Sequence, residues 1–387
     1  MANWDELPEE LVIEIGERVG RYDDFESVAE VSSHWKSSLR STSYCGRSPQ
    51  VPWLMLPAVE DENIDKASTT SLRFYSLSKR MIHHQCTMPM KINDVRCYSS
   101  NGWLLMVSRY LSMSLYNPFS GRQIPLPDKT SLGDHDVFDD TNDDDDDCKD
   151  MFAQFVQKCA LSSSPSSGID DFSVMIIYGK FSRLAIWSVG DNAWTRVEAA
   201  GHMFKGAFLD ITCFQGDFYA VDCECRVLAV ACTRSKPGMG EITKTPIKAN
   251  VVVDVSRFCP EFVIPYLVES GNKLLVVPRS FANEDSLKFS VLEVNVSNGE
   301  AQEVNDLGNM ALFLGDNHSM SIEASTRNGC KANCIYLADD SVHCRLECFK
   351  EEKRFAIYNL SDSSVEHCYA GEMCSRFTSS LWIEPRH

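Results

Sequence analysis

The chain has 387 residues, of which 44% are hydrophobic and 24% are charged, a composition that supports a folded core and excludes a wholly disordered or fibrous protein. Its net charge of −18 argues against nucleic acid as a partner, because such a surface repels phosphate groups. Residues 134–150 hold ten Asp and one Lys, so half of the total charge comes from this stretch. Because it is strongly self-repelling and poor in apolar side chains, we expect residues 133–150 to form a disordered insert.

Cellular location is indicated only by what the sequence lacks. The N-terminal residues are acidic and do not resemble a secretory signal, and no apolar run approaches the ~18 residues that a membrane helix requires. We therefore expect a protein of the nucleus and/or cytoplasm without membrane contact. In those compartments the sixteen cysteines are expected to be reduced thiols, mostly buried.

Residues 1–45 predict three short helices. Pro8 suits the first position of a helix, and the acidic residues after it face the positive end of the helix dipole. Leu11, Ile15 and Val19 then recur with helical spacing and predict one apolar stripe. Three helices of this length bury too little surface to be stable alone, so the segment needs a packing partner.

The second and third helices are predicted from capping residues. Asp23 or Asp24 is expected to cap a second helix, which carries Phe25, Val28 and Val31. Ser32 or Ser33 is expected to cap a third, on which Trp35 and Leu39 lie one turn apart.

From about residue 50 the apolar pattern changes to the period of two that is typical of strands. A turn followed by a strand recurs at Asn101-Gly102, Gln215-Gly216, Gly271-Asn272 and Asn333, with spacings near those of kelch-type propeller blades. We predict a mainly β fold with a small α N-terminal module, in which the helices precede a β-propeller of about six blades. An irregular β-sandwich or two stacked β domains remain the alternatives.

The first 40 residues resemble the F-box, whose pattern is a Leu-Pro-x-Glu-Leu start, an Asp-led segment with spaced valines and a final Trp with basic neighbours. The matching positions are Leu7, Pro8, Glu10, Leu11, Ile15, Val28, Val31 and Trp35. The resemblance implies that residues 1–45 form a trihelical module that docks on the Skp-type adaptor of a cullin-RING ubiquitin ligase. The adaptor-binding residues that it implies are Leu7, Pro8, Leu11, Ile15, Val28, Val31 and Trp35.

The remaining chain resembles plant F-box proteins that carry a C-terminal, kelch-like β-propeller domain of unknown function. The similarity lies in the segment L-Y-N-P-F-S-G-R-Q-I-P-L-P at 115–127 and in residues 313–321, 333–340 and 355–360. It implies that residues 50–387 form the propeller. These motifs are structural and do not identify a target.

Motifs for chemistry are weak throughout. Cys330, Cys334, Cys344 and Cys348 have a spacing that zinc can use, but strand alternation is expected to pack Cys334 beside Tyr336 as a buried thiol. The sequence lacks a nucleophile elbow and a glycine-rich phosphate loop. A glycosidase-type carboxylate pair stays open, because 55 acidic residues offer many pairs and none stands out. We expect no catalytic residue, no metal and no cofactor.

These observations favour a non-catalytic, substrate-recognition subunit of an SCF-type E3 ubiquitin ligase. The F-box would hold the adaptor and the β domain would bind a target protein whose identity the sequence does not give. A propeller scaffold that acts without the adaptor is the alternative, and an enzyme built on the propeller is a third, weaker one.

Overall fold

The computed structural model describes residues 4–19, 22–40, 50–56, 70–88, 90, 95–132, 155–165, 171–199, 207–231, 247–260, 263–281, 287–315, 318–325, 328–338, 355–368 and 380–385. The expected insert at 133–150 lies outside the described residues, as do Cys344 and Cys348. No helix in the described ranges is long and apolar enough to cross a membrane.

Three α-helices follow a short 3₁₀ turn, η1 (Trp4–Glu6): α1 (Glu9–Arg18), α2 (Tyr22–Ala29) and α3 (Ser33–Arg40). Pro8 precedes α1 rather than occupying its first turn, and its carbonyl accepts hydrogen bonds from the amides of Leu11 at 3.0 Å and Val12 at 3.2 Å. The expectation that Asp23 or Asp24 caps α2 is wrong, because the helix already begins at Tyr22. The expected cap of α3 is confirmed, since the Trp35 amide donates to Ser32 Oγ at 3.3 Å.

The strands of the described residues form five sheets, mostly antiparallel. One sheet orders β26 (Leu381–Ile383), β1 (Trp53–Leu56), β2 (Thr70–Ser76) and β3 (Met81–Met88). The next orders β4 (Val95–Ser100), β5 (Trp103–Ser108), β6 (Met113–Tyr116) and β7 (Gln123–Pro125). An eight-stranded sheet orders β12 (Phe208–Phe214), β13 (Asp217–Asp222), β14 (Arg226–Val230), β15 (Ile247–Asp254), β11 (Thr195–Ala199), β10 (Arg183–Ser188), β9 (Ser173–Tyr178) and β8 (Val156–Leu161).

Two five-stranded sheets complete the set. The first orders β16 (Val263–Ser270), β17 (Lys273–Phe281), β19 (Leu292–Asn295) and β20 (Glu300–Glu303), with β18 (Leu287–Phe289) paired to β17. The second orders β22 (Met320–Glu323), β21 (Met310–Leu314), β23 (Cys334–Ala338), β24 (Phe355–Asn359) and β25 (Val365–Cys368). Short 3₁₀ turns, η3 (Lys129–Leu132) and η5 (Ser256–Phe258), lie between sheets.

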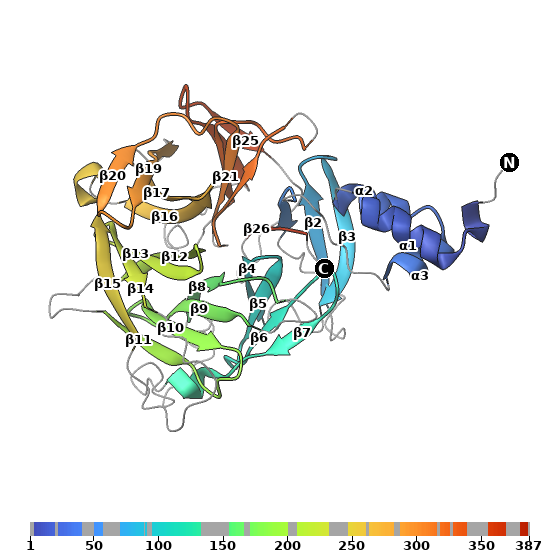
Figure 1. Ribbon diagram of the computed structural model, residues 1–387, viewed down its shortest axis with the longest axis horizontal. Coiled ribbons are helices and arrows are strands. Elements are labelled where there is room, and N and C mark those ends of the chain that lie inside the picture. The colour runs from blue at the N-terminus through green and yellow to red at the C-terminus, as the bar shows by residue number, and fades with distance from the viewer. Residues whose placement is uncertain are drawn as a thin grey trace, which may run out of the picture.

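The sheets surround a common centre, which is the arrangement of a β-propeller and not of a sandwich (Figure 1). Strands β26, β4, β8, β12, β16 and β22 form the inner ring, each lying against the next from β26 to β22. The ring is closed within one sheet, because β26 pairs with β1 through Met55↔Leu381 and Trp53↔Ile383. The predicted mainly β, propeller architecture is therefore confirmed, and the helices project outward beside β2 and β3 (Figure 1).

Local sequence signals predicted the hairpins correctly. Both residues of each predicted turn at Asn101-Gly102, Gln215-Gly216 and Gly271-Asn272 have positive φ, as two-residue hairpins with right-handed strand twist require. Strand alternation is also as predicted at β23: Cys334 and Tyr336 pack in one core cluster, and Ile335 in the neighbouring one. Cys330 shares the cluster of Cys334.

Candidate functional site

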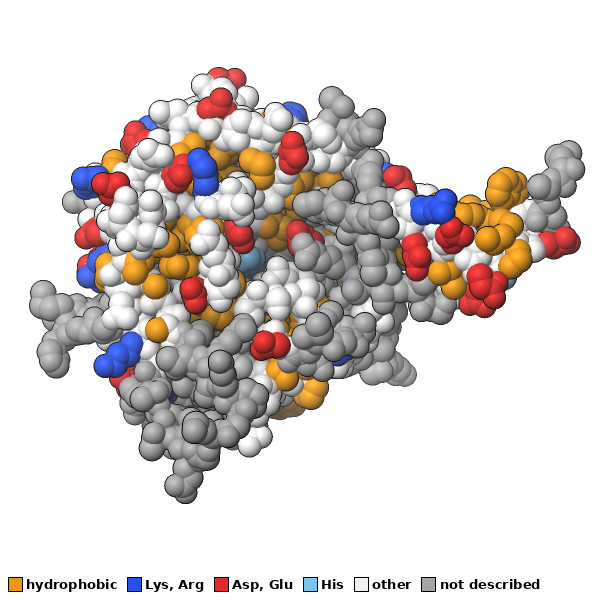
Figure 2. Space-filling model, in the orientation of Figure 1, with side chains coloured by type: hydrophobic (Ala, Val, Ile, Leu, Met, Phe, Trp, Pro, Cys, Tyr) orange, Lys and Arg blue, Asp and Glu red, His pale blue; other side chains and the backbone are white. Residues whose placement is uncertain are grey.

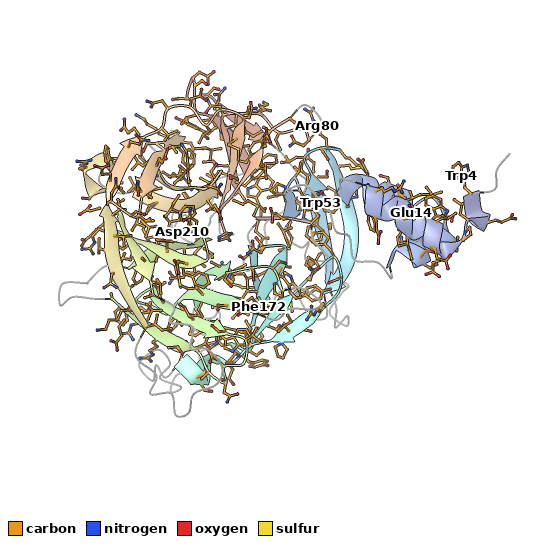
Figure 3. The ribbon with its side chains drawn as sticks, in the orientation of Figure 1. Trp4, Glu14, Trp53, Arg80, Phe172 and Asp210 are labelled. Carbon is orange, nitrogen blue, oxygen red and sulfur yellow. The ribbon has the colours of Figure 1, made fainter. Side chains whose placement is uncertain are left out.

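An apolar groove on the helical module is the first candidate surface. It is lined by Trp4, Leu7, Leu11, Glu14, Ile15 and Arg18. Trp4 is 60% exposed and Leu11 45%, large fractions for side chains of this kind. Figure 2 shows apolar side chains gathered on the projecting module, and Figure 3 places Trp4 at its outer end and Glu14 along α1. Glu14 and Arg18 pair with each other at the border of the groove.

Helix α3 fixes the segment that forms the outer end of this groove. The indole Nε1 of Trp35 donates to the Trp4 carbonyl at 2.9 Å, and His34 Nε2 donates to the Leu7 carbonyl at the same distance. Both acceptors precede α1, and the Trp4 carbonyl also accepts from the Leu7 amide at 3.4 Å. The two side chains of α3 thus tie this segment to the rest of the module. These two hydrogen bonds hold the segment before α1 against the start of α3.

The buried face of the module belongs to a core that continues into the ring, because its buried residues share one cluster with Trp53 and Phe74. Val12, Phe25, Ala29, Trp35 and Leu39 are buried there. Gly16 is buried on the side of α1 that faces α3. A Cβ at this position would lie 2.4 Å from Leu39 Cδ2 and 3.2 Å from Phe25 Cε2. A glycine therefore allows the two helices to approach closely.

The predicted site residues divide into three groups. Leu7, Leu11 and Ile15 line the groove, with exposed Pro8 next to them in the chain. Trp35 is buried in the core, and Val28 is half-buried against it. Val31 is 56% exposed but does not line the groove.

The contribution of Trp4 was not predicted, and the predicted stripe of α1 is divided: Ile15 and Val19 pack against the core, but Leu11 is exposed. Val12 and Gly16 face the core, whereas Leu11 faces outward. The i, i+4 pairing of Val12 with Gly16 was hard to recognise because glycine carries no apolar signal. A large aromatic residue shortly before Leu7-Pro8 was the signal available for Trp4.

A second candidate is the polar cluster at the centre of the ring. Asp210, labelled in Figure 3, lies on β12. It is fully buried, 3.4 Å from Lys158 Nζ on β8. Its carboxylate also accepts hydrogen bonds from the amides of Leu267 and Ile211, both at 2.9 Å, and from Ser319 Oγ at 3.3 Å. Burial raises the pKa of Asp210, while Lys158 opposes that shift. The donors come from several inner strands of the ring. We therefore interpret the cluster as structural: it holds these strands together.

His318 belongs to the same centre. Its imidazole lies 2.9 Å from Thr212 Oγ1, and its amide donates to the Ser99 carbonyl at 2.9 Å. Burial, with Lys158 nearby, lowers the pKa of His318 to about 4. The imidazole of His318 is therefore neutral, not cationic, at pH 7.

Metal-ligating groups do not converge in the part of the chain that the structure describes. No set of three His, Cys, Asp or Glu side chains there could hold a metal ion. Cys330 and Cys334 are buried, and burial raises the pKa of the Cys334 thiol, which disfavours the thiolate that zinc needs.

The chain is similar to known proteins over most of its length. The model of the KIB1-4 β-propeller family matches residues 74–359, about three quarters of the sequence. The chain belongs to this family. This confirms the predicted membership among plant F-box proteins with a kelch-like propeller.

The relatives are F-box proteins of Arabidopsis thaliana. A probable F-box protein is 22% identical over 409 residues, covering 99% of this chain and 96% of its own length. The F-box protein SKIP23 is 22% identical over 362 residues, covering 84% and 81%. Among solved structures, the Swd1 β-propeller domain of Myceliophteria thermophila is 8% identical with a TM-score of 0.39, covering 80% of this chain and 84% of that one.

Proposed function

We propose that the protein is a non-catalytic, substrate-recognition subunit of an SCF-type ubiquitin ligase. In this proposal residues 1–45 are the F-box that docks on a Skp-type adaptor, and residues 50–387 are the domain that binds a target protein. The observation that carries the proposal is the groove with Trp4 and Leu11 exposed on a small module, in a chain whose relatives are F-box proteins.

The proposal includes a ring of six blades. The eight-stranded sheet reads as two four-stranded blades, β8–β11 and β12–β15, which are joined edge to edge by the parallel pairing of β11 with β15. With the other four sheets this gives six blades around six inner strands.

The physical argument for an adaptor rests on apolar burial. Fully burying a side chain such as Leu is worth about 1.5–3 kcal/mol, so Trp4, Leu7, Leu11 and Ile15 together offer enough for a specific contact. The function that follows is proximity: a target held on the ring and an enzyme held through the adaptor react as if within one molecule.

The test is capture of a purified Skp-type adaptor by the full-length protein. Leu11→Asp is expected to reduce capture at least tenfold, because it places a charge in the groove. An acid in the first turn of α1 suits the helix dipole, so the helix should persist. The matched control is Val251→Asp, since Val251 on β15 is 48% exposed, close to the 45% of Leu11.

The outcomes separate clearly. Normal capture by the wild-type protein and the Val251 variant, with loss in the Leu11 variant, supports the proposal. Absence of capture by the wild-type protein would favour a scaffold that acts without the adaptor. Equal capture by all three proteins would mean that the groove is not the docking surface.

A further inference from the structure

Three successive turns of the ring share one hydrogen-bond pattern. They connect β5 to β6, β9 to β10 and β13 to β14, the second and third strands of each antiparallel run. In each, the last turn residue has a positive φ and its amide donates to the carbonyl three residues earlier: Leu111 to Ser108 at 2.8 Å, Ser182 to Gly179 at 3.0 Å and Cys225 to Asp222 at 3.0 Å.

The residue before the positive-φ position differs among these turns. It is Tyr110 in the first, 80% exposed, and Phe181 in the second, 62% exposed. In the third it is Glu224, whose carboxylate pairs with Arg226 at 2.9 Å. Because Glu224 occupies the same turn position, the turn itself does not require an aromatic ring. The exposed rings of Tyr110 and Phe181 are therefore not a requirement of the turn.

Each exposed ring carries a guanidinium group on its face. Arg109 Cζ lies 5.5 Å from the centroid of Tyr110, and Arg183 Cζ lies 5.4 Å from that of Phe181. Lys180 is exposed beside Phe181. Residues 108–112 and 179–183 thus hold three cations and no acid, although the whole chain has a net charge of −18. We call Arg109, Tyr110, Lys180, Phe181 and Arg183 the aromatic–cationic rim.

The two turns of the rim lie at the same end of the ring. The Gly179 amide donates to the Phe155 carbonyl at 2.7 Å, and the Phe208 amide donates to the Ser182 carbonyl at 3.2 Å, so this turn lies where β8 and β12 begin. Leu111, from the other turn, packs in the same core cluster as Phe155. Their sheets are neighbours in the ring (Figure 1).

We propose that the aromatic–cationic rim binds an acidic segment of the target protein that also carries apolar side chains. Charge complementarity selects the acidic residues, and the exposed rings of Tyr110 and Phe181 provide apolar contact area. Aromatic and Arg side chains are the types that most often dominate the energy of protein interfaces. The inference rests on the proposed function, because it specifies which part of the ring would receive the target.

The test uses a phage-displayed library of random 16-residue peptides, selected on the full-length protein. The enriched peptides are expected to contain more Asp and Glu than the input library. Their binding should weaken at least tenfold on the Tyr110→Ala/Phe181→Ala double variant and fall as salt rises from 0.1 to 0.5 M. Glu224→Ala is the matched control at the equivalent turn position, and its binding should equal that of the wild-type protein.

Two results would overturn the proposal. One is enrichment of peptides without excess acid, or no enrichment. The other is equal binding of the enriched peptides by the wild-type protein and the double variant. Melting temperatures within a degree or two of wild type verify folding, which is expected because both rings are exposed.

Capture of the adaptor is measured in parallel on the same variants. Peptide binding by the rim without adaptor capture by the wild-type protein would refute the proposed ligase function and leave the rim intact. Adaptor capture without rim-dependent peptide binding would refute the role of the rim and leave the proposed ligase function intact.

Discussion

The helical module and the ring bury their side chains to very different degrees. Every residue of β5 and of β9 is buried, whereas in the ten residues of α1 only Val12 and Gly16 are. The ring buries most of its apolar surface by packing sheet against sheet, and part of its core is shared with the module. The module leaves an apolar groove unburied, which is the property of a part that works by association. The ring thus carries most of the buried core, and the module leaves apolar side chains open to a partner.

The largest expected effect is a fall in the free energy of unfolding of the ring, caused by Trp382→Ala. Trp382 is fully buried on β26, with its ring 5.1 Å from Phe313 and 5.5 Å from Phe355. Removing a buried Trp costs about 3–5 kcal/mol, which denaturant unfolding will report. Trp4→Ala is the control: this exposed Trp should leave the free energy of unfolding unchanged. A Trp382 variant with wild-type stability would contradict the role assigned to β26.

A smaller effect, confined to the module, is expected from Gly16→Val. The new side chain meets Leu39 and Phe25 at distances that require a shift, and overpacking of this kind costs about 1–3 kcal/mol. Adaptor capture should therefore weaken, while the melting transition of the ring stays in place. Glu17→Val introduces the same side chain at an exposed position of α1 and should have little effect. A shifted ring transition in the Gly16 variant would show that the two regions unfold together.

The pH dependence of the ring is expected to depend on His318. Its pKa is about 4 in the folded protein, below the ordinary value of 6.5, so the unfolded chain binds a proton more readily. Stability contributed by the neutral imidazole is present above pH 6.5 and is lost as the pH falls to 4, by about 3 kcal/mol. His318→Gln should flatten this part of the stability profile, measured by denaturant unfolding at pH 7 and pH 4.5. Parallel profiles for the two proteins would contradict the assignment.

The smallest effect is expected from the acidic stretch. Replacing residues 134–150 by a Gly/Ser sequence of equal length removes self-repulsion without removing any described core residue. The melting temperature should stay the same or rise slightly, as calorimetry would show. A fall of several degrees would mean that these residues pack on the ring or bind a cation.

Sequence patterns predicted the features that depend on neighbouring residues. The turn at Asn101-Gly102 and the alternation of Cys334 with Ile335 are local, because positive φ and strand period are properties of a few residues. The phase of α1 was not predictable, since Leu11 and Val12 are both apolar and only contact with α3 chooses between them. The pair Lys158 and Asp210, 52 positions apart, comes together only when the ring closes. The rim was missed for the same reason, because equivalence of two turns is a property of the repeat.

The pairing of β1 with β26 has a consequence for biosynthesis. The partner strands lie more than 300 residues apart in the chain, and translation at ~5–20 residues per second separates their synthesis by tens of seconds. During that interval β1 has an open edge, with unpaired backbone groups of the kind that recruit other strands. The helices, in contrast, are synthesised first and contact each other over short sequence distances. At that stage the module still lacks the complete sheet that shares its core cluster, and premature termination before residue 381 would leave the edge of β1 permanently available for aggregation.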